Sequence, residues 1–342
     1  MIDPALPPPP LPPARSAPRP SVSVSSPWIM LGGAAYGLLM RILFGLWPFG
    51  HGNAGGAGPM LVSFLFLVPL VIGVWSVSRL APERRTLGMS LILPWGPTAL
   101  FVTGTAILAI EGSICIALAI PIFLIMASIG GLIAWIVLRF KPPVGATNAV
   151  LVLPLILGVA EQQTAIPDAH GHSTESIHIA ARPEKIWHLI NDATGIAPSE
   201  MAQGWAWRIG VPYPVSAVTV EEDGQRVRKL KWQKGVHFDE PILDWNENRY
   251  IRWSYRFAPD SIPPGALDEH VEVGGRYFDL VDTSYRLEPE GDGTRLTIDV
   301  NYRISTRFNW YAARLGRFLV DDAAQTILDF YKHRSETDAR NG

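Results

Sequence analysis

The feature that most constrains this chain is a change of character near residue 160. Residues 28–160 hold four or five apolar runs, whereas the sequence from Ser173 onward is charged, rich in Trp and Tyr, and patterned like β-strands. A run of about 20 apolar residues is long enough for a helix to cross a bilayer. The chain is therefore expected to join a membrane-embedded half to a water-soluble half.

The apolar half predicts an α-helical membrane bundle of four to five transmembrane helices. Residues 28–49 and 60–77 supply one helix each, and residues 87–140 are long enough for two. The natural break between those two is Glu111-Gly112-Ser113. Residues 142–160 carry no charge and are the candidate fifth span.

The distribution of Lys and Arg predicts the orientation of these helices. Short loops rich in Lys and Arg stay in the cytoplasm. Basic residues precede the first run and follow the second and fourth, whereas residues 51–59 and 111–113 carry none. This pattern places the N-terminus of a multi-pass protein in the cytoplasm. The membrane is expected to be a bacterial inner membrane. Five spans put the soluble domain in the periplasm, and four spans leave it in the cytoplasm.

Two charged residues, Arg41 and Glu111, lie inside or at the end of the apolar runs. Charges within a membrane are costly and tend to pair. Arg41 and Glu111 are therefore candidates for a membrane charge pair. The simpler interpretation is that Arg41 extends to the interface and that Glu111 is a solvated turn residue.

The remaining boundaries follow from composition. Residues 1–27 form a Pro-rich segment with little to bury, so a disordered tail is expected. Residues 161–172 are polar with Pro and Gly and predict a linker. The folded domain is expected at residues 173–336, followed by a disordered tail at residues 337–342.

The second half is patterned like an α+β domain. Residues 173–181 alternate as a strand does, Pro183 marks a helix start, and a short helix is expected near residues 196–206. Strands follow at residues 215–222, 226–232, 238–245, 250–257, 277–287 and 295–304. A long helix at residues 310–334 ends the domain. Asp223-Gly224 between two strands is typical of a hairpin.

The order of these elements resembles the START-like (SRPBCC) superfamily of polyketide cyclase/dehydrase and lipid-transport proteins. The resemblance rests on the segments SIHIAARPEKIWHLIND, FDEPILDW and RFLVDDAAQTILDFYKHR, and it covers residues 173–336 only. It implies a helix-grip fold, in which a curved antiparallel sheet surrounds a long C-terminal helix. Members include carriers as well as enzymes, so the resemblance specifies the fold better than the chemistry.

The resemblance also implies a cavity between the sheet and the long helix that takes an apolar ligand. Large amphipathic side chains are the usual lining of such pockets. The aromatic residues that suit this role are Trp205, Trp207, Trp253, Tyr255, Tyr277 and Tyr285. For any single one of them, a place in the packed core is the simpler interpretation. The long loop at residues 259–276 is a candidate lid, and a surface loop is the alternative.

The candidates for chemistry are weak. His237 and Asp239 share one face of a predicted strand and Glu240 lies on the other, while Asp279 lies on a later strand. A His with a carboxylate in an apolar cavity could act in general acid-base catalysis, although a solvated sheet face is the simpler interpretation. No metal site is expected, because His170 and His172 lack enough partner ligands.

The sequence therefore favours a membrane-anchored domain that binds or carries a hydrophobic, lipid-like small molecule. The alternatives are a cyclase- or hydrolase-type enzyme acting on an apolar substrate in the same cavity, or a ligand-sensing interaction module. No cofactor is expected. The 29 basic and 31 acidic residues leave a net charge of -2, which argues against a nucleic-acid partner. The expected partners are the ligand and the bilayer, and the sequence identifies no protein partner.

Overall fold

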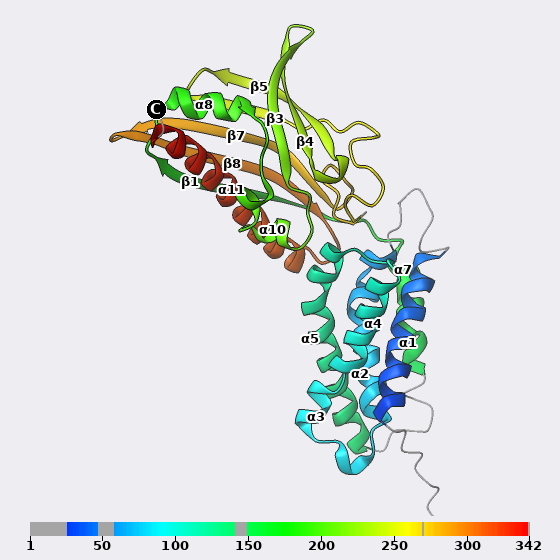
Figure 1. The fold of residues 1–342 in the computed structure, drawn as a ribbon. Coiled ribbons are helices and arrows are strands. Elements are labelled where there is room, and N and C mark those ends of the chain that lie inside the picture. Colours follow the sequence, from blue (N-terminus) through cyan, green and yellow to red (C-terminus); the bar gives the residue numbers. More distant parts are fainter. Residues whose placement is uncertain (1–25, 47–57, 141–148, 269, 341–342) are drawn as a thin grey trace, which may run out of the picture.

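The computed structural model describes residues 26–46, 58–140, 149–268 and 270–340. Figure 1 shows two parts, a bundle of helices and a domain built on a large curved sheet, with the sheet domain beside one end of the bundle. The change of character near residue 160 coincides with the passage from one part to the other.

The bundle is formed by the apolar half of the chain. The break expected at residues 111–113 is confirmed, because one helix ends at Ile107 and the next begins at Ser113. The helices are α1 (Ser26–Gly45), α2 (Val68–Ser78, preceded by a π-helical turn, Ser63–Leu67), α3 (Leu87–Ile92), α4 (Trp95–Ile107), α5 (Ser113–Val137) and α7 (Leu153–Glu161).

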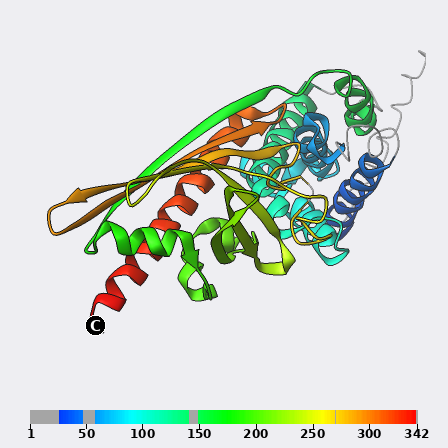
Figure 2. The ribbon, with the colours of Figure 1, turned by 90° about the horizontal axis from the view of Figure 1, so that it is seen from above.

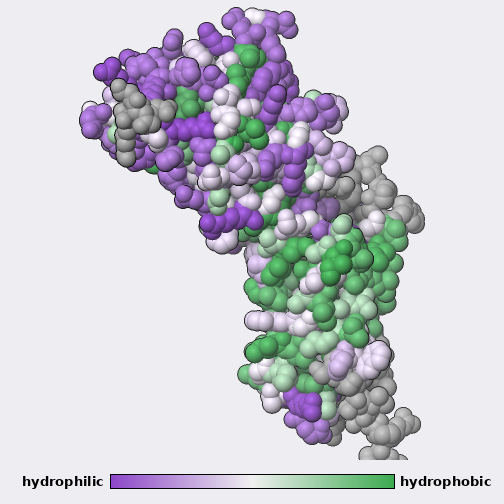
Figure 3. Space-filling view, viewed as in Figure 1, coloured by the Kyte–Doolittle hydropathy of each residue, from purple (hydrophilic) through white to green (hydrophobic). Residues whose placement is uncertain are grey.

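The outer surface of the bundle is apolar. Ile107, Ile125 and Ile156 are 77%, 60% and 62% exposed, and hydrophobic residues cover most of the bundle face seen in Figure 3, apart from the end far from the domain. Three helices, Pro27–Gly45, Leu87–Ile107 and Ser113–Phe140, are long and apolar enough to cross a membrane. The apolar helices at Ser63–Ser78 and Val150–Glu161 are shorter, so the expected total of four to five spans stays a prediction.

Glycines allow α2 and α5 to pack closely against each other's backbone. A Cβ atom at Gly73 would collide with the backbone of Ala127, and one at Gly130 would collide with the backbone of Leu70. Small residues allow apolar helices to approach in this way where a hydrophobic driving force is weak.

The domain contains an eight-stranded antiparallel sheet with the order β1-β8-β7-β6-β5-β4-β3-β2. The hairpin predicted at Asp223-Gly224 joins β3 to β4, which pair as adjacent strands. The strands are β1 (Asp168–Ile179), β2 (Asp192–Ala193), β3 (Pro214–Glu222), β4 (Gln225–Trp232), β5 (His237–Asn246), β6 (Tyr250–Ser254), β7 (Phe278–Glu290) and β8 (Gly293–Ser305).

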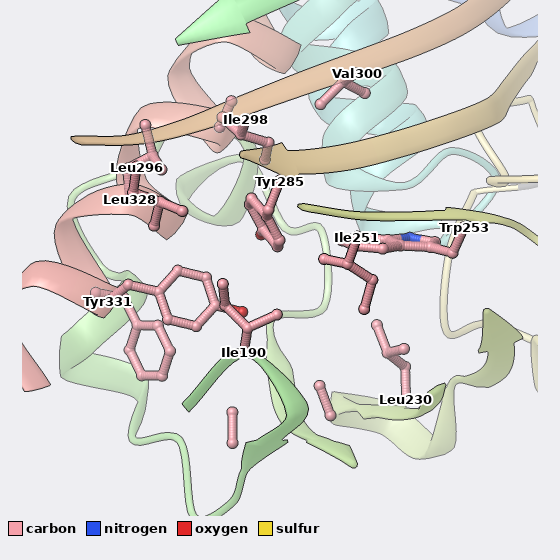
Figure 4. Close-up of a cluster of buried hydrophobic side chains, with 14 of the residues drawn as sticks. Ile190, Leu230, Ile251, Trp253, Tyr285, Leu296, Ile298, Val300, Leu328 and Tyr331 are labelled. Atoms are coloured by element: carbon pink, nitrogen blue, oxygen red, sulfur yellow. The ribbon is translucent and has the colours of Figure 1, made fainter. Parts of the chain in front are cut away.

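The long C-terminal helix lies along one side of this sheet (Figures 1 and 2). This helix, α11 (Asn309–Arg340), buries Ala324, Leu328 and Tyr331 against a core that also contains Leu296 and Tyr285 (Figure 4). The shorter helices are α8 (Pro183–Asn191), α9 (Pro198–Met201) and α10 (Trp205–Arg208). The arrangement of a curved sheet and a C-terminal helix is the predicted helix-grip fold.

Several boundaries differ from the sequence prediction, and α11 extends to Arg340, into the segment that was expected to be a disordered tail. The first strand begins at Asp168, inside the segment expected to be a linker, because it pairs with β8 along its whole length, from Asp168 opposite Ser305 to Ile179 opposite Thr294. The strand expected at residues 250–257 ends at Ser254. His170 and His172 lie on the exposed face of β1. Their polar side chains therefore did not produce the apolar pattern from which a strand is predicted.

Candidate ligand-binding cavity

A cavity of about 380 Å³ lies between the sheet and α11 and continues to the domain-facing end of the bundle. Its volume is within the range of small-molecule sites. Apolar side chains form most of its wall, including Leu230 and Ile298 from the sheet and Val320, Ala323 and Ile327 from α11.

Five of the six predicted aromatic residues line this cavity. They are Trp207, Trp253, Tyr255, Tyr277 and Tyr285. The prediction for Trp205 is wrong, because its side chain is 50% exposed and lies beneath the guanidinium of Arg208 on the surface. Residues two apart on a helix point in nearly opposite directions, so α10 directs Trp207 inward and Trp205 outward.

Trp253 belongs to the packed wall of the cavity. Only 2% of the residue is exposed, its ring centroid is 5.2 Å from that of Tyr285, and Figure 4 shows it near Ile251. The neighbouring Tyr255 hydroxyl is 2.7 Å from Oγ1 of Thr283, and burial raises the pKa of Tyr255. Trp253 and Tyr255 are therefore held in place by packing and hydrogen bonding in the cavity wall.

A buried ion pair supplies the polar end of the domain cavity. Arg228 and Glu240 are direct neighbours on β4 and β5, they are bonded to each other, and their side chains are 6% and 3% exposed. Arg228 also donates to the carbonyl of Ile190 at 3.0 Å and to the hydroxyl of Tyr331 at 3.2 Å. Burial raises the pKa of Glu240 to about 7, against the opposing effect of Arg228.

The other candidates for chemistry lie away from the cavity. His237 is exposed on the outer face, with Nδ1 3.1 Å from the carbonyl of Gly235 and Nε2 3.7 Å from Asp260. Asp239, on the same outer face, pairs with Lys229.

Asp279 lies 3.8 Å from Arg303 and is one-third exposed. Of the four candidates, His237, Asp239, Glu240 and Asp279, Glu240 alone is in the lining that the structure describes.

Arg228 was missed by the sequence analysis, although the signal was present. On β4 the side chains of Arg228, Leu230 and Trp232 share one face, and the apolar pair indicates that this face points inward. A charged residue in an inward-facing row needs a buried partner. Glu240 has the same inward position in the FDEPILDW strand, and the register of the two strands brings the residues together.

The bundle contributes a second ion pair to the cavity wall. Arg41 and Glu111, the two charged residues of the apolar half that were singled out, are bonded to each other and are 12% and 15% exposed. The solvated-turn interpretation of Glu111 is therefore wrong. Part of the loop at residues 259–276, the candidate lid, also borders the cavity, because Leu267 and Val271 line it.

Among the residues that the structure describes, none form a group of three or more His, Cys, Asp or Glu able to hold a metal ion. His172 instead contacts its strand neighbours, with Nδ1 2.9 Å from Oδ1 of Asn301 and Nε2 2.7 Å from Oγ1 of Thr174.

Comparison with known families agrees with this geometry. The family described as "Polyketide cyclase / dehydrase and lipid transport" matches residues 170–332, about half of the chain. Residues 170–332 are a START-like domain of this family. The curved sheet with its C-terminal helix fits the START-like fold. No curated protein matches the chain.

Several solved structures are similar to the START-like domain. TTHA0849 from Thermus thermophilus is 16% identical with a TM-score of 0.32, covering 49% of this chain and 99% of that one. The Zhui aromatase/cyclase from a Streptomyces species is 13% identical with a TM-score of 0.31, covering 50% and 96%. A START superfamily protein from Mycobacterium smegmatis is 13% identical with a TM-score of 0.32, covering 49% and 99%.

Proposed function

We propose that this chain is a membrane-anchored protein whose START-like domain binds or carries one hydrophobic, lipid-like small molecule. The observation that carries this proposal is the apolar cavity of about 380 Å³ between the sheet and α11. An apolar ligand gains free energy by leaving water for such a space. Its aromatic wall, which includes Trp253 and Tyr285, is firmly packed and therefore pre-formed.

The apolar helices support the membrane anchor and suggest its orientation. α1 begins at the end of the bundle far from the domain, and the turn between α4 and α5 lies at the domain end (Figure 1). The basic residues Arg79, Arg84 and Arg85 follow α2 at the far end. By the positive-inside rule, this arrangement favours five crossings, a cytoplasmic N-terminus and a periplasmic domain in a bacterial inner membrane. Residues 28–160 would then be the membrane domain and residues 173–336 most of the ligand-binding domain.

One observation favours an enzyme as the second candidate. Glu240 lies in the cavity wall, and its pKa is raised by burial to about 7, which suits a group that gives or takes protons near neutral pH. In this alternative Glu240, rather than His237, would act on an apolar substrate. A bound molecule that stays chemically unchanged in wild type and in Glu240→Gln supports the carrier. Accumulation of an unconverted molecule in Glu240→Gln alone supports the enzyme.

A substitution that fills the cavity tests the binding proposal. Ala323 lines the cavity from α11, so Ala323→Phe would occupy space that the ligand needs. Ala202 is exposed, and Ala202→Phe is the matched control for adding a phenyl ring. The measurement is the amount of apolar molecule extracted per mole of purified full-length protein. Ala323→Phe should lose most of it and Ala202→Phe should retain it. Equal amounts in both variants would reject the cavity as the binding site.

A further inference from the structure

The cavity does not end where the START-like domain ends. Its wall includes Val102 and Thr105 of α4, Ala119 and Phe123 of α5, and Phe64 before α2. The interior of the bundle therefore forms one continuous space with the interior of the domain. A simple membrane anchor would not require this continuity.

Specific contacts hold the two parts together around the junction. Asp268 accepts a hydrogen bond from the backbone N–H of Cys115 at 2.9 Å, and the hydroxyl of Ser113 donates to the carbonyl of Ile209 at 2.8 Å. From α11, the hydroxyl of Tyr311 donates to the carbonyl of Leu118 at 2.8 Å. Three separate segments of the domain therefore contact the N-terminal part of α5.

The cavity wall contains two Arg–Glu ion pairs, and their side chains differ in exposure. Arg228 already donates to Glu240, Tyr331 and the carbonyl of Ile190. The side chains of Arg228 and Glu240 are almost fully buried. The Arg41–Glu111 pair in the bundle is two to five times more exposed, at 12% and 15%. A ligand head group is therefore better received at the bundle end, with the apolar tail extending into the domain.

The charges in the wall indicate what kind of head group fits. The acidic and basic side chains in the described lining form these two Arg–Glu pairs, beside His270. An ionised Arg–Glu pair carries no net charge. A charged head group would be buried without a counter-charge, which is costly, whereas a hydroxyl can exchange hydrogen bonds with the pair.

We infer that the site takes a neutral amphipath, with its hydroxyl-bearing head against Arg41 and Glu111 inside the bundle and its apolar tail in the START-like cavity. The bundle is then half of the binding site and the route by which a membrane-soluble ligand reaches the domain. This inference rests on the proposed function, because it specifies the ligand of the same cavity.

The test uses two photoreactive monoacylglycerols on the full-length protein in mild detergent. One probe carries its diazirine beside the glycerol ester and the other at the end of the chain. Crosslinks that unlabelled monoolein suppresses are mapped by mass spectrometry. The head-proximal probe should label residues 111–123, and the terminal probe should label β6 or α11. Oleate, with the same chain and a charged head, should compete about tenfold more weakly than monoolein.

Variants separate the bundle half from the domain half. Ala119→Phe and Val102→Phe fill the bundle end from two different helices and should each reduce the suppressible crosslinks about tenfold. Ala106→Phe places the same ring on an exposed position of α4 and should leave them unchanged. Should Ala119→Phe fail to fold, Val102→Phe decides the question.

Each other outcome rejects a defined part of the account. Suppressible crosslinks confined to the domain, unchanged in Ala119→Phe and Val102→Phe, would overturn the shared site and leave the proposed function standing. A head-proximal probe that labels the surroundings of Arg228 would overturn the orientation. Oleate competing as well as monoolein would overturn the neutral head group. No suppressible crosslink anywhere would overturn the proposed function as well.

Discussion

Two neighbouring residues of α11 should respond differently to truncation. Leu328 is fully buried in the core beside Leu296 (Figure 4), whereas Ile327 is only partly buried and borders the cavity. Each substitution to Ala removes three carbon atoms. At about 0.8 kcal/mol per buried CH₂, the transfer term for Leu328→Ala is about 2.4 kcal/mol. The new void raises the total towards the range of about 2–5 kcal/mol for such sites.

Ile327→Ala should cost less than this transfer term. Its side chain already faces a space that is not filled by protein, so truncation breaks fewer contacts and creates little new void. We expect a loss of about 1–2 kcal/mol. Ile327→Ala also enlarges the cavity and should alter the affinity for an apolar ligand. Leu328→Ala should leave that affinity closer to the wild-type value.

Pulse proteolysis of the full-length protein in detergent, across a urea titration, measures both effects. The intensity of the intact domain band reports the folded fraction. With a urea slope of about 2 kcal/mol per molar, Leu328→Ala should lower the midpoint by at least about 1 M, and Ile327→Ala by clearly less. Equal shifts, or a larger shift for Ile327→Ala, would refute the assignment of one residue to the core and the other to the cavity wall.

Three further results are expected. Hydrogen bonds from Arg334 hold the pKa of Glu200 below its ordinary value. The stabilisation from this contact is therefore fully present above about pH 4.3 and is lost as the pH falls through the pKa of the folded state. The urea midpoint of Glu200→Gln should vary less with pH in that window than the midpoint of the wild type. Arg228→Met leaves Glu240 buried without its partner and should cost about 3–5 kcal/mol of unfolding free energy near pH 8, by the same proteolysis assay. A reporter that is active only in the cytoplasm, fused after Gly342, should be silent, and strong activity would contradict the five-crossing topology.

Local patterns were sufficient to predict most elements of the fold. The break at Glu111-Gly112-Ser113 and the hairpin at Asp223-Gly224 are set by residues that are close in sequence, and both are present in the structure. The start of β1 was missed because residues 168–172 are stabilised by pairing with β8, more than 120 positions away. No local pattern reports such a partner.

The site was only partly predictable for the same reason. Strand alternation correctly separated Glu240 from His237, and five aromatic residues were assigned to the cavity. Trp205 was wrong because α10 is a single turn, too short for a helical period to show which side is buried. The Arg41–Glu111 contact joins residues 70 positions apart, and the extension of the cavity into the bundle depends on how two folded parts meet.

Native mass spectrometry of the full-length protein, released from mild detergent, tests the central claim most directly. The account predicts a population heavier than the bare chain by the mass of one apolar molecule, with the added mass removed by organic extraction. Ala323→Phe should lack that population. A protein that stays at its bare mass, even after incubation with a lipid extract of its own membranes, would contradict the claim that the cavity is a ligand site.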